Sequence, residues 1–295
     1  MPDHSNRAIE AVFRDDCLFD QVDYLMPSVI NQPIAVISGG SSGIGLECAR
    51  LLCARGYRVT LLARDELRLE SAKASILATT GCEVAVRRLD VIDSQACAQA
   101  IAEIAAQAGR IDWLITSAGI AEPGLFAALK LESHRSQMET NYFGTLNLVI
   151  PTARAMGHGG GGRITLISSG AAFIGIAGYS AYAPGKFAVR ALGEILRVEL
   201  APQRISVSVA FPSDTDTPQL TRELLSRPEV TRRIAARAGS LTAYHVAERL
   251  LEDAQAGRFM LTPTWLMSAF GFFHSLYAPL FRWKQRRLLR GLKRQ

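Results

Sequence analysis

The sequence lacks the cysteine and leader patterns of a secreted protein. Its five cysteines, at positions 17, 48, 53, 82 and 97, form no Cys-x-x-Cys pair, and their number is odd. This argues against a disulfide framework and a cysteine metal site, and is typical of apolar cysteines in a reducing compartment. Residues 1–32 contain six acidic residues and no sustained apolar run, which argues against a secretory signal. We interpret them as an extension with a short helix at about residues 8–19.

Acidic residues are also absent from the end of the chain. Seven basic residues and no acid stand there: Arg282, Lys284, Arg286, Arg287, Arg290, Lys293 and Arg294. The net charge of the chain is +6, so removing these seven leaves −1 for the rest. Nucleic-acid binding relies on basic residues that meet the phosphates. Because the basic charge is confined to the tail, we expect no nucleic-acid partner.

The pattern of apolar residues predicts one large α/β domain. A chain of 295 residues that is 48% hydrophobic can bury a substantial core. Runs typical of buried strands alternate with helical patterns. We expect strands at 33–37, 57–64, 84–89, 111–116, 163–167, 205–211 and 259–261, with helices after residue 45 and at 94–108, 131–156 and 179–200. This order predicts a doubly wound, mostly parallel sheet of Rossmann type with helices on both faces.

A glycine-rich turn follows the first predicted strand. Gly39, Gly43 and Gly45 form a Gly-x-x-x-Gly-x-Gly pattern between that strand and a helix, where backbone N–H groups can receive a pyrophosphate. The second strand ends at Arg64, where NAD-dependent enzymes usually carry an acid. A guanidinium there suits a 2′-phosphate and favours NADP(H). The alternative is that Arg64 is a solvated charge.

A second motif predicts proton-transfer chemistry. Tyr182 and Lys186 are four residues apart, so on a helix they share a face. A neighbouring ammonium favours phenolate, so we expect the Tyr182 pKa to lie below about 10. Ser169 follows the strand at 163–167 and can donate to a substrate oxygen. In isolation the Tyr-x-x-x-Lys pair is a weak indication of a catalytic site. The predicted cofactor site in the same chain strengthens that interpretation.

Taken together, residues 33–262 resemble the short-chain dehydrogenase/reductase family. The motifs that carry the resemblance are the glycine pattern, Asp90, Ala118-Gly119, Asn141, Ser169, Tyr182-x-x-x-Lys186 and the segment at Pro212. The resemblance implies an oxidoreductase in which Tyr182 donates a proton, Lys186 holds the nicotinamide ribose and lowers the Tyr182 pKa, Ser169 orients the carbonyl and Asn141 supports a water relay. It implies NADP(H) contacts by Gly39, Ser41, Ser42, Gly43, Ile44, Gly45, Arg64, Arg68, Asp90, Tyr182, Lys186, Thr215 and Thr217.

Within the family, the segment Ala210 to Pro218 resembles the reductases that act on 3-ketosphingoid bases. The resemblance implies a long-chain keto-sphingoid or similar lipid substrate. We hypothesise that Asp214 or Asp216 pairs with the ammonium beside the ketone, the alternative being that both acids cap a turn. There are two other interpretations. One is another lipid-active carbonyl reductase, for steroid, retinoid or 3-ketoacyl substrates, and the other is a catalytically silent NADP-sensing or scaffolding protein.

The last segment, residues 263–295, predicts contact with a membrane. Residues 259–281 contain no charged side chain and are followed by the basic cluster. Thr262-Pro263 and Pro279 interrupt the apolar run, so we favour an interfacial or re-entrant anchor over a true span, and a true span over an intersubunit or substrate-tunnel helix. This places the protein on the cytoplasmic side of a membrane. By resemblance, we also expect a homo-oligomer built on the helices at 132–156 and 179–200. We expect no metal site.

Overall fold

The computed structural model describes residues 32–236 and 239–292 of the chain. The chain divides into two compact units, Met1–Gln32 and Pro33–Gln295. The helix expected at residues 8–19 and the rest of the predicted extension lie outside the described residues, apart from Gln32. The fold is therefore that of the second unit.

The second unit is built on a seven-stranded parallel sheet with the strand order β3-β2-β1-β4-β5-β6-β9. Its strands are β1 (Ile34–Ser38), β2 (Arg58–Ala63), β3 (Ala85–Arg88), β4 (Trp113–Thr116), β5 (Gly162–Ile167), β6 (Ile205–Ala210) and β9 (Met260–Leu261). A separate parallel pair joins β7 (Thr215–Asp216) to β8 (Leu241–Thr242). The strand order reverses between β1 and β4, as in doubly wound folds. The predicted fold class is confirmed.

Ten α-helices connect or flank the described strands. They are α1 (Gly43–Ala54), α2 (Glu66–Thr80), α3 (Ser94–Ala108), α4 (Leu131–Met138), α5 (Gly144–His158), α6 (Ala183–Glu199), α7 (Pro218–Ser226), α8 (Glu229–Ala235), α9 (Ala243–Gln255) and α10 (Trp265–Leu292). Local signals set several boundaries: Asp93 caps α3 by accepting from the N–H of Ala96, and Gly109 ends it with φ of 76°. Pro184 is tolerated because it lies in the first turn of α6.

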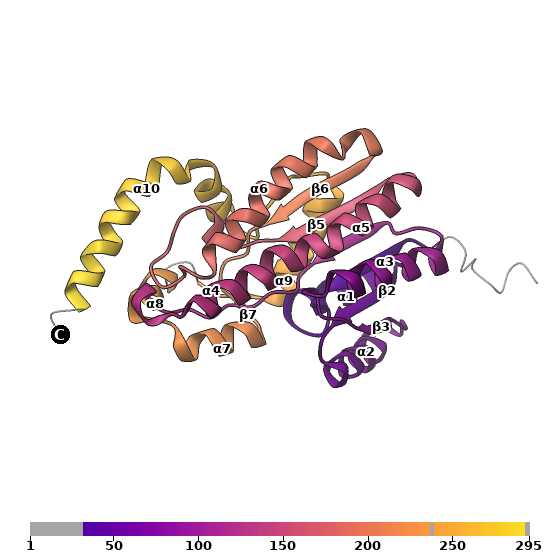
Figure 1. The fold of residues 1–295 in the computed structure, drawn as a ribbon, viewed down its shortest axis with the longest axis horizontal. Helices are drawn as coiled ribbons and strands as arrows, with labels where there is room; N and C mark the ends of the chain where they lie inside the picture. Colours follow the sequence, from indigo (N-terminus) through magenta and orange to yellow (C-terminus); the bar gives the residue numbers. More distant parts are fainter. Residues whose placement is uncertain (1–31, 237–238, 293–295) are drawn as a thin grey trace, which may run out of the picture. The chain divides into compact units, whose positions relative to one another are not determined.

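The core has two halves, one on each face of the sheet. In β1, Ile34 and Val36 pack with residues of α3, α5 and α6, whereas Ala35 and Ile37 pack with residues of α1, α2 and α9. Successive side chains of a strand point to opposite faces, so an unbroken apolar strand must be covered on both. Figure 1 shows β5 and β6 running alongside α5 and α6.

The helix expected at 131–156 is not continuous. A π-helical segment, η3 (Glu139–Phe143), separates α4 from α5. Its wider turn shifts the helical register, and such segments are frequent at functional sites. Asn141 and Thr140 within it are buried.

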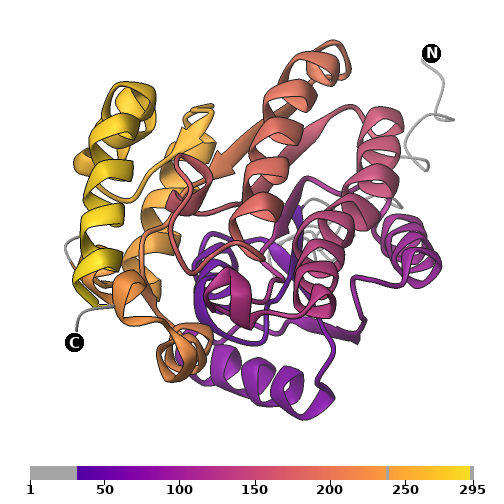
Figure 2. The same cartoon turned by 60° about the vertical axis from the view of Figure 1, so that its left-hand side comes forward.

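The apolar and basic residues at positions 265–292 form one long helix, α10 (Figure 2). It continues through Pro279, although a proline removes a hydrogen bond with the residue four positions earlier. Both Pro279 and Ser275, whose carbonyl loses that partner, are exposed to water. Met267 and Phe270 of α10 pack on the core, and the Gln285 side chain donates to the Gly175 carbonyl and accepts from the Ala177 N–H.

None of the helices among residues 32–236 and 239–292 has the length and apolar character that crossing a membrane requires.

Candidate active site

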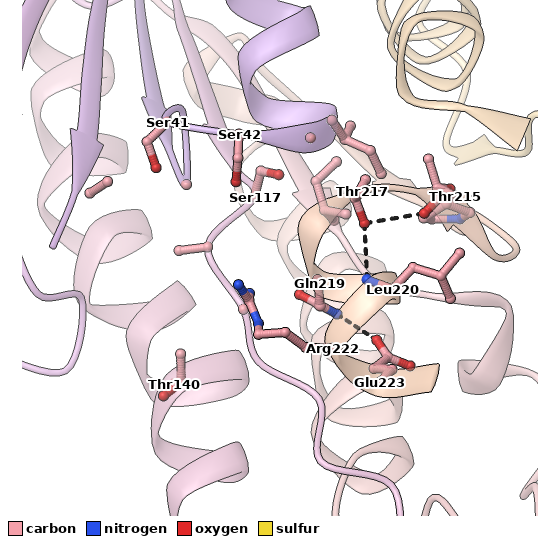
Figure 3. A pocket seen from close by; sticks show the side chains of 18 of the residues that line it. Ser41, Ser42, Ser117, Thr140, Thr215, Thr217, Gln219, Leu220, Arg222 and Glu223 are labelled. Atoms are coloured by element: carbon pink, nitrogen blue, oxygen red, sulfur yellow. Dashed lines mark hydrogen bonds between the residues drawn. The ribbon is translucent and has the colours of Figure 1, made fainter. Parts of the chain in front are cut away.

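A pocket opens at the carboxyl ends of the strands, where the strand order reverses. The loops after β1, β2, β4, β5 and β6 and the helices α6 and α7 all contribute to its wall. Most of the predicted site residues line it: Gly39, Ser41, Ser42, Gly43, Ile44, Arg64, Arg68, Tyr182, Lys186, Thr215 and Thr217. Gly45, Asp90, Asn141 and Ser169 do not line it directly. Figure 3 shows Ser41 and Ser42 of the glycine loop and side chains of α7 around this pocket.

The glycine loop is shaped by close backbone contacts. Gly39 and Gly43 have φ of 67° and 57°, in the left-handed region that favours glycine. A Cβ on Gly39 would lie 2.7 Å from the Ala118 nitrogen, and one on Gly45 would lie 2.5 Å from the Gly39 oxygen. Ser42, the N-cap of α1, makes no side-chain capping bond. The first N–H groups of α1 therefore keep their capacity to bind an anion.

Two arginines extend the pocket beyond the glycine loop. Arg64, after β2, and Arg68, in the first turn of α2, both line it. The Arg64 guanidinium lies 3.9 Å from an Asp90 oxygen, and the other Asp90 oxygen accepts from the Ile92 N–H. Asp90 thus orients Arg64 and the turn after β3. Two cationic side chains beside a helix N-terminus have the charge that suits phosphate groups.

Tyr182, Lys186 and Ser169 meet at the start of α6. Tyr182 is the N-cap of α6, and Ser169 is the N-cap of the short segment η4 (Gly170–Ala172). The Ser169 side chain hydrogen-bonds the Tyr182 side chain and also accepts from the Ala171 N–H at 3.1 Å. The neighbouring Ser168 hydroxyl instead donates to the Lys186 carbonyl at 2.8 Å. The geometry favours Ser169 as the partner of the phenol.

Lys186 is buried and points back to the sheet. Its ammonium donates to the Ile167 carbonyl at 3.0 Å and lies 5.6 Å from the centre of the Tyr182 ring. Only 5% of the residue is exposed. Burial lowers the pKa of Lys186 to about 8, and the charge of Glu223 opposes that change.

The expectation of a lowered Tyr182 pKa is wrong for this structure. Burial raises the pKa of Tyr182 well above its ordinary value, and the negative charge of Glu223 raises it further. The hydrogen bond from Ser169 and the charge of Arg227 act in the opposite direction. The spacing of Tyr182 and Lys186 predicted that the lysine lies near the phenol. It did not predict that the phenol is buried or that Glu223 of α7 lies close to it. The phenol is therefore protonated at neutral pH.

Asn141 lies beneath the pocket. Its side-chain oxygen accepts from the Ile120 N–H and its amide donates to the Ile120 carbonyl, both at 2.9 Å. A Cβ on Gly119 would lie 3.0 Å from that oxygen and 3.6 Å from the Lys186 nitrogen. Asn141 and Lys186 thus approach the same glycine. Asn141 therefore braces the loop after β4.

The segment after β6 closes the pocket opposite the glycine loop. Thr217 caps α7 by accepting from the Leu220 N–H at 3.3 Å, and its hydroxyl donates to the Thr215 carbonyl at 3.1 Å (Figure 3). A Cβ on Gly43 would lie 2.9 Å from the Thr217 methyl carbon. The two halves of the pocket therefore touch at Gly43 and Thr217.

The same wall holds a buried acidic cluster that was not predicted from the sequence. Glu223 of α7 accepts from the Tyr179 hydroxyl at 3.0 Å, from Gln219 at 3.0 Å and from Arg227 at 3.1 Å. Arg227 also donates to both oxygens of Asp214, at 2.5 and 3.1 Å. One signal was available, because residues 219, 223 and 227 are spaced four apart on one helical face.

The chain matches the model of a protein family, "short chain dehydrogenase", over residues 33–227. It is 38% identical to a 3-dehydrosphinganine reductase of Arabidopsis thaliana over 248 residues, which cover 80% of this chain and 73% of the relative. It is 35% identical to a 3-dehydrosphinganine reductase of Danio rerio, with 79% and 71% covered. The solved structure of a short-chain dehydrogenase from Sphingobium yanoikuyae in complex with NADPH superimposes with a TM-score of 0.71 at 25% identity, covering 89% of this chain and 96% of the other.

Proposed function

Because the chain belongs to the short-chain dehydrogenase family, we propose that it uses NADPH to reduce the ketone of 3-dehydrosphinganine, also called 3-ketodihydrosphingosine, in sphingolipid biosynthesis. Ser169, Tyr182 and Lys186 beside a glycine-lined pocket are the observation that carries the proposal. The similarity to 3-dehydrosphinganine reductases supports the substrate.

The residues of the pocket fit a phosphorylated dinucleotide. The glycine loop leaves no room for a Cβ, and the first N–H groups of α1 suit a pyrophosphate. Arg64 and Arg68 supply positive charge where the second strand ends, which suits the 2′-phosphate that distinguishes NADPH from NADH. When bound, NADPH supplies the hydride that adds to the carbonyl carbon. Lys186 and Thr215 line the pocket on the side of Tyr182, where the nicotinamide ribose would lie.

Tyr182 supplies the proton. Its raised pKa keeps the phenol protonated at neutral pH, which is the form that can donate to the carbonyl oxygen as the hydride arrives at carbon. Ser169, bonded to the same phenol, stabilises the developing alkoxide as a second donor. Asn141, which reaches Gly119 beside Lys186, supports the water-mediated return of a proton to the lysine and tyrosine.

A substrate panel tests the proposed function. NADPH oxidation is followed on adding 3-dehydrosphinganine, a steroid ketone, retinal and a 3-ketoacyl thioester, and each assay is repeated with NADH. We expect the highest kcat/KM for 3-dehydrosphinganine with NADPH. Oxidation of NADPH only with another ketone would refute the substrate, and no oxidation with any ketone would refute the reductase.

We propose that α10 docks on a membrane surface. Its exposed apolar side chains include Trp265, Phe272, Leu276 and Trp283, spaced at seven, four and seven residues along one row. The exposed basic residues Arg282, Arg286 and Arg290 are four apart near its end. An apolar row followed by cations suits insertion among anionic lipid headgroups. We propose the domain boundaries that the sequence predicts: an extension at 1–32, the reductase domain at 33–262 and the membrane-associating segment at 263–295.

Vesicle sedimentation tests the docking. Phosphatidylcholine vesicles with and without phosphatidylserine are mixed with the wild type, Leu276→Asp and a matched control, Leu67→Asp, which alters an equally exposed leucine on α2. We expect the wild type and the control to sediment with the anionic vesicles and Leu276→Asp to stay in solution. Equal sedimentation of all three would refute docking through α10. Docking on the cytoplasmic side of a membrane would bring the site to a lipid substrate.

We also propose a homo-oligomer built on α5 and α6. Ile150 of α5 and Ile195 and Val198 of α6 are apolar and 46–73% exposed, and a second copy would cover them. Light scattering after size exclusion tests the mass, and a monomer at micromolar concentration would refute the proposal.

A further inference from the structure

A buried carboxylate with spare hydrogen-bonding capacity lies in the pocket wall. Glu223 is 7% exposed and its side chain lines the pocket from α7 (Figure 3). One of its oxygens accepts from Tyr179 and Arg227, and the other accepts only from Gln219. A carboxylate offers about four acceptor positions, so one position on the second oxygen has no partner among the described residues.

Glu223 shares its ion-pair partner with a second acid. Asp214 and Glu223 each carry a negative charge, and Arg227 is the one cation bonded to both. The Arg227 side chain is 2% exposed and that of Glu223 is 8% exposed, whereas that of Asp214 is 26% exposed, so water screens the charge of Glu223 only weakly. The charge of Lys186, a second buried cation, also interacts with that of Glu223, but its ammonium donates to the Ile167 carbonyl. A buried carboxylate with an open acceptor position suits a ligand cation that can hydrogen-bond.

Glu223 is also close to the reacting groups. The Tyr179 hydroxyl that it binds belongs to a ring whose centre is 5.3 Å from that of Tyr182. Glu223 is therefore one aromatic residue away from the phenol. In a 2-amino-3-ketone the ammonium is carried by the carbon next to the carbonyl carbon, so it must lie near any group that contacts the carbonyl oxygen.

We propose that Glu223 binds the ammonium group of the substrate and thereby selects 2-amino ketones over ketones without the amine. The inference rests on the proposed function and names the residue that determines its specificity. It revises the hypothesis drawn from the sequence. Both oxygens of Asp214 are held by Arg227, and Asp216 is exposed and does not line the pocket. Tyr179, Gln219 and Arg227 position the Glu223 carboxylate.

The test compares two ketones that differ only in the amine. These are 3-dehydrosphinganine and the 1-hydroxy-3-ketone of the same chain length without the amino group. The specificity ratio is kcat/KM for the first divided by kcat/KM for the second, with NADPH at saturation. A charge-assisted hydrogen bond corresponds to a fold-change of roughly 10 to 100, so we expect Glu223→Gln to lower the ratio by about that factor. Glu223→Asp, which keeps the charge, should recover part of it.

Controls separate recognition of the amine from a structural role. Asp216→Asn removes an acid from the same segment, and we expect its ratio to equal that of the wild type. NADPH binding, measured by fluorescence, reports whether Glu223→Gln keeps its fold and cofactor site. An equal loss of kcat/KM for both ketones in Glu223→Gln would overturn the inference, because it would mean that Glu223 only supports the pocket. A lowered ratio in Asp216→Asn with an unchanged ratio in Glu223→Gln would also overturn it.

The same assay distinguishes failure of the inference from failure of the proposed function. If the wild type reduces neither ketone, the proposed function fails. If it reduces 3-dehydrosphinganine with NADPH and Glu223→Gln keeps the wild-type ratio, only the role of Glu223 fails.

Discussion

Replacing Lys186 by methionine will change how the stability of the cofactor-free protein depends on pH. The pKa of Lys186 falls from an ordinary 10.5 to about 8 because the side chain is buried. At 1.36 kcal/mol for each unit of pKa, burial of the charged form costs ~3 kcal/mol. Below pH 8 the lysine is charged in both the folded and the unfolded protein, so folding bears the full cost. Between pH 8 and 10.5 only the unfolded chain holds the proton, and stability rises with pH.

Urea unfolding at pH 7, 8, 9 and 10 measures this effect. The informative quantity is the free energy of unfolding of the wild type minus that of Lys186→Met, because titration of the other groups largely cancels. We expect this difference to rise by about 1.4 kcal/mol for each pH unit above 8, towards a total of ~3 kcal/mol. Lys130→Met, at an exposed lysine, is the matched control and should give a flat difference. A flat difference for Lys186→Met as well would refute the burial of a charged lysine.

Three further substitutions test other parts of the structure. Tyr182→Phe should lower kcat at least about a hundredfold, because it removes the proposed proton donor, while NADPH binding measured by fluorescence changes little. A kcat near that of the wild type would contradict the role of Tyr182 as proton donor. Arg64→Ala should raise the KM for NADPH about tenfold and leave the KM for NADH unchanged. Steady-state kinetics measure both constants, and an equal rise in the two would argue against binding of the 2′-phosphate by Arg64. Gln285→Leu should lower the free energy of unfolding by about 1–3 kcal/mol, because the Gly175 carbonyl and the Ala177 N–H lose their hydrogen-bond partner. Urea titration measures this change, and an unchanged midpoint would mean that the two bonds contribute nothing to stability.

Local patterns were sufficient to predict the sheet and the glycine loop. The runs around Ile34 and Ile205 are apolar and β-branched, and both form buried strands within two residues of the predicted ends. The turn from Gly39 to Gly45 needs conformations and close contacts that only glycine tolerates, so it carries its own signature. Ser169 and Tyr182 meet because both follow the same strand, β5.

The predictions that were wrong, for the Tyr182 pKa, the helix at 131–156 and the interruption at Pro279, concern properties that neighbouring residues in the sequence do not determine. The Tyr182 pKa depends on burial and on Glu223, which is 41 positions away and is one acid among 27 acidic residues. The π-helical segment at Asn141 inserts an irregular turn into an otherwise helical pattern. Pro279 suggested an interruption, yet α10 continues because the carbonyl that loses its partner is at an exposed position.

Removing α10 to improve solubility would also change the candidate active site of this chain. Gln285 tethers residues 175 and 177, which lead within a few positions to Tyr179 and Tyr182. A chain truncated after residue 263 would lose the two hydrogen bonds of Gln285 together with the apolar helix α10. Its turnover number would then describe a pocket without this contact, and would not stand for that of the chain of 295 residues.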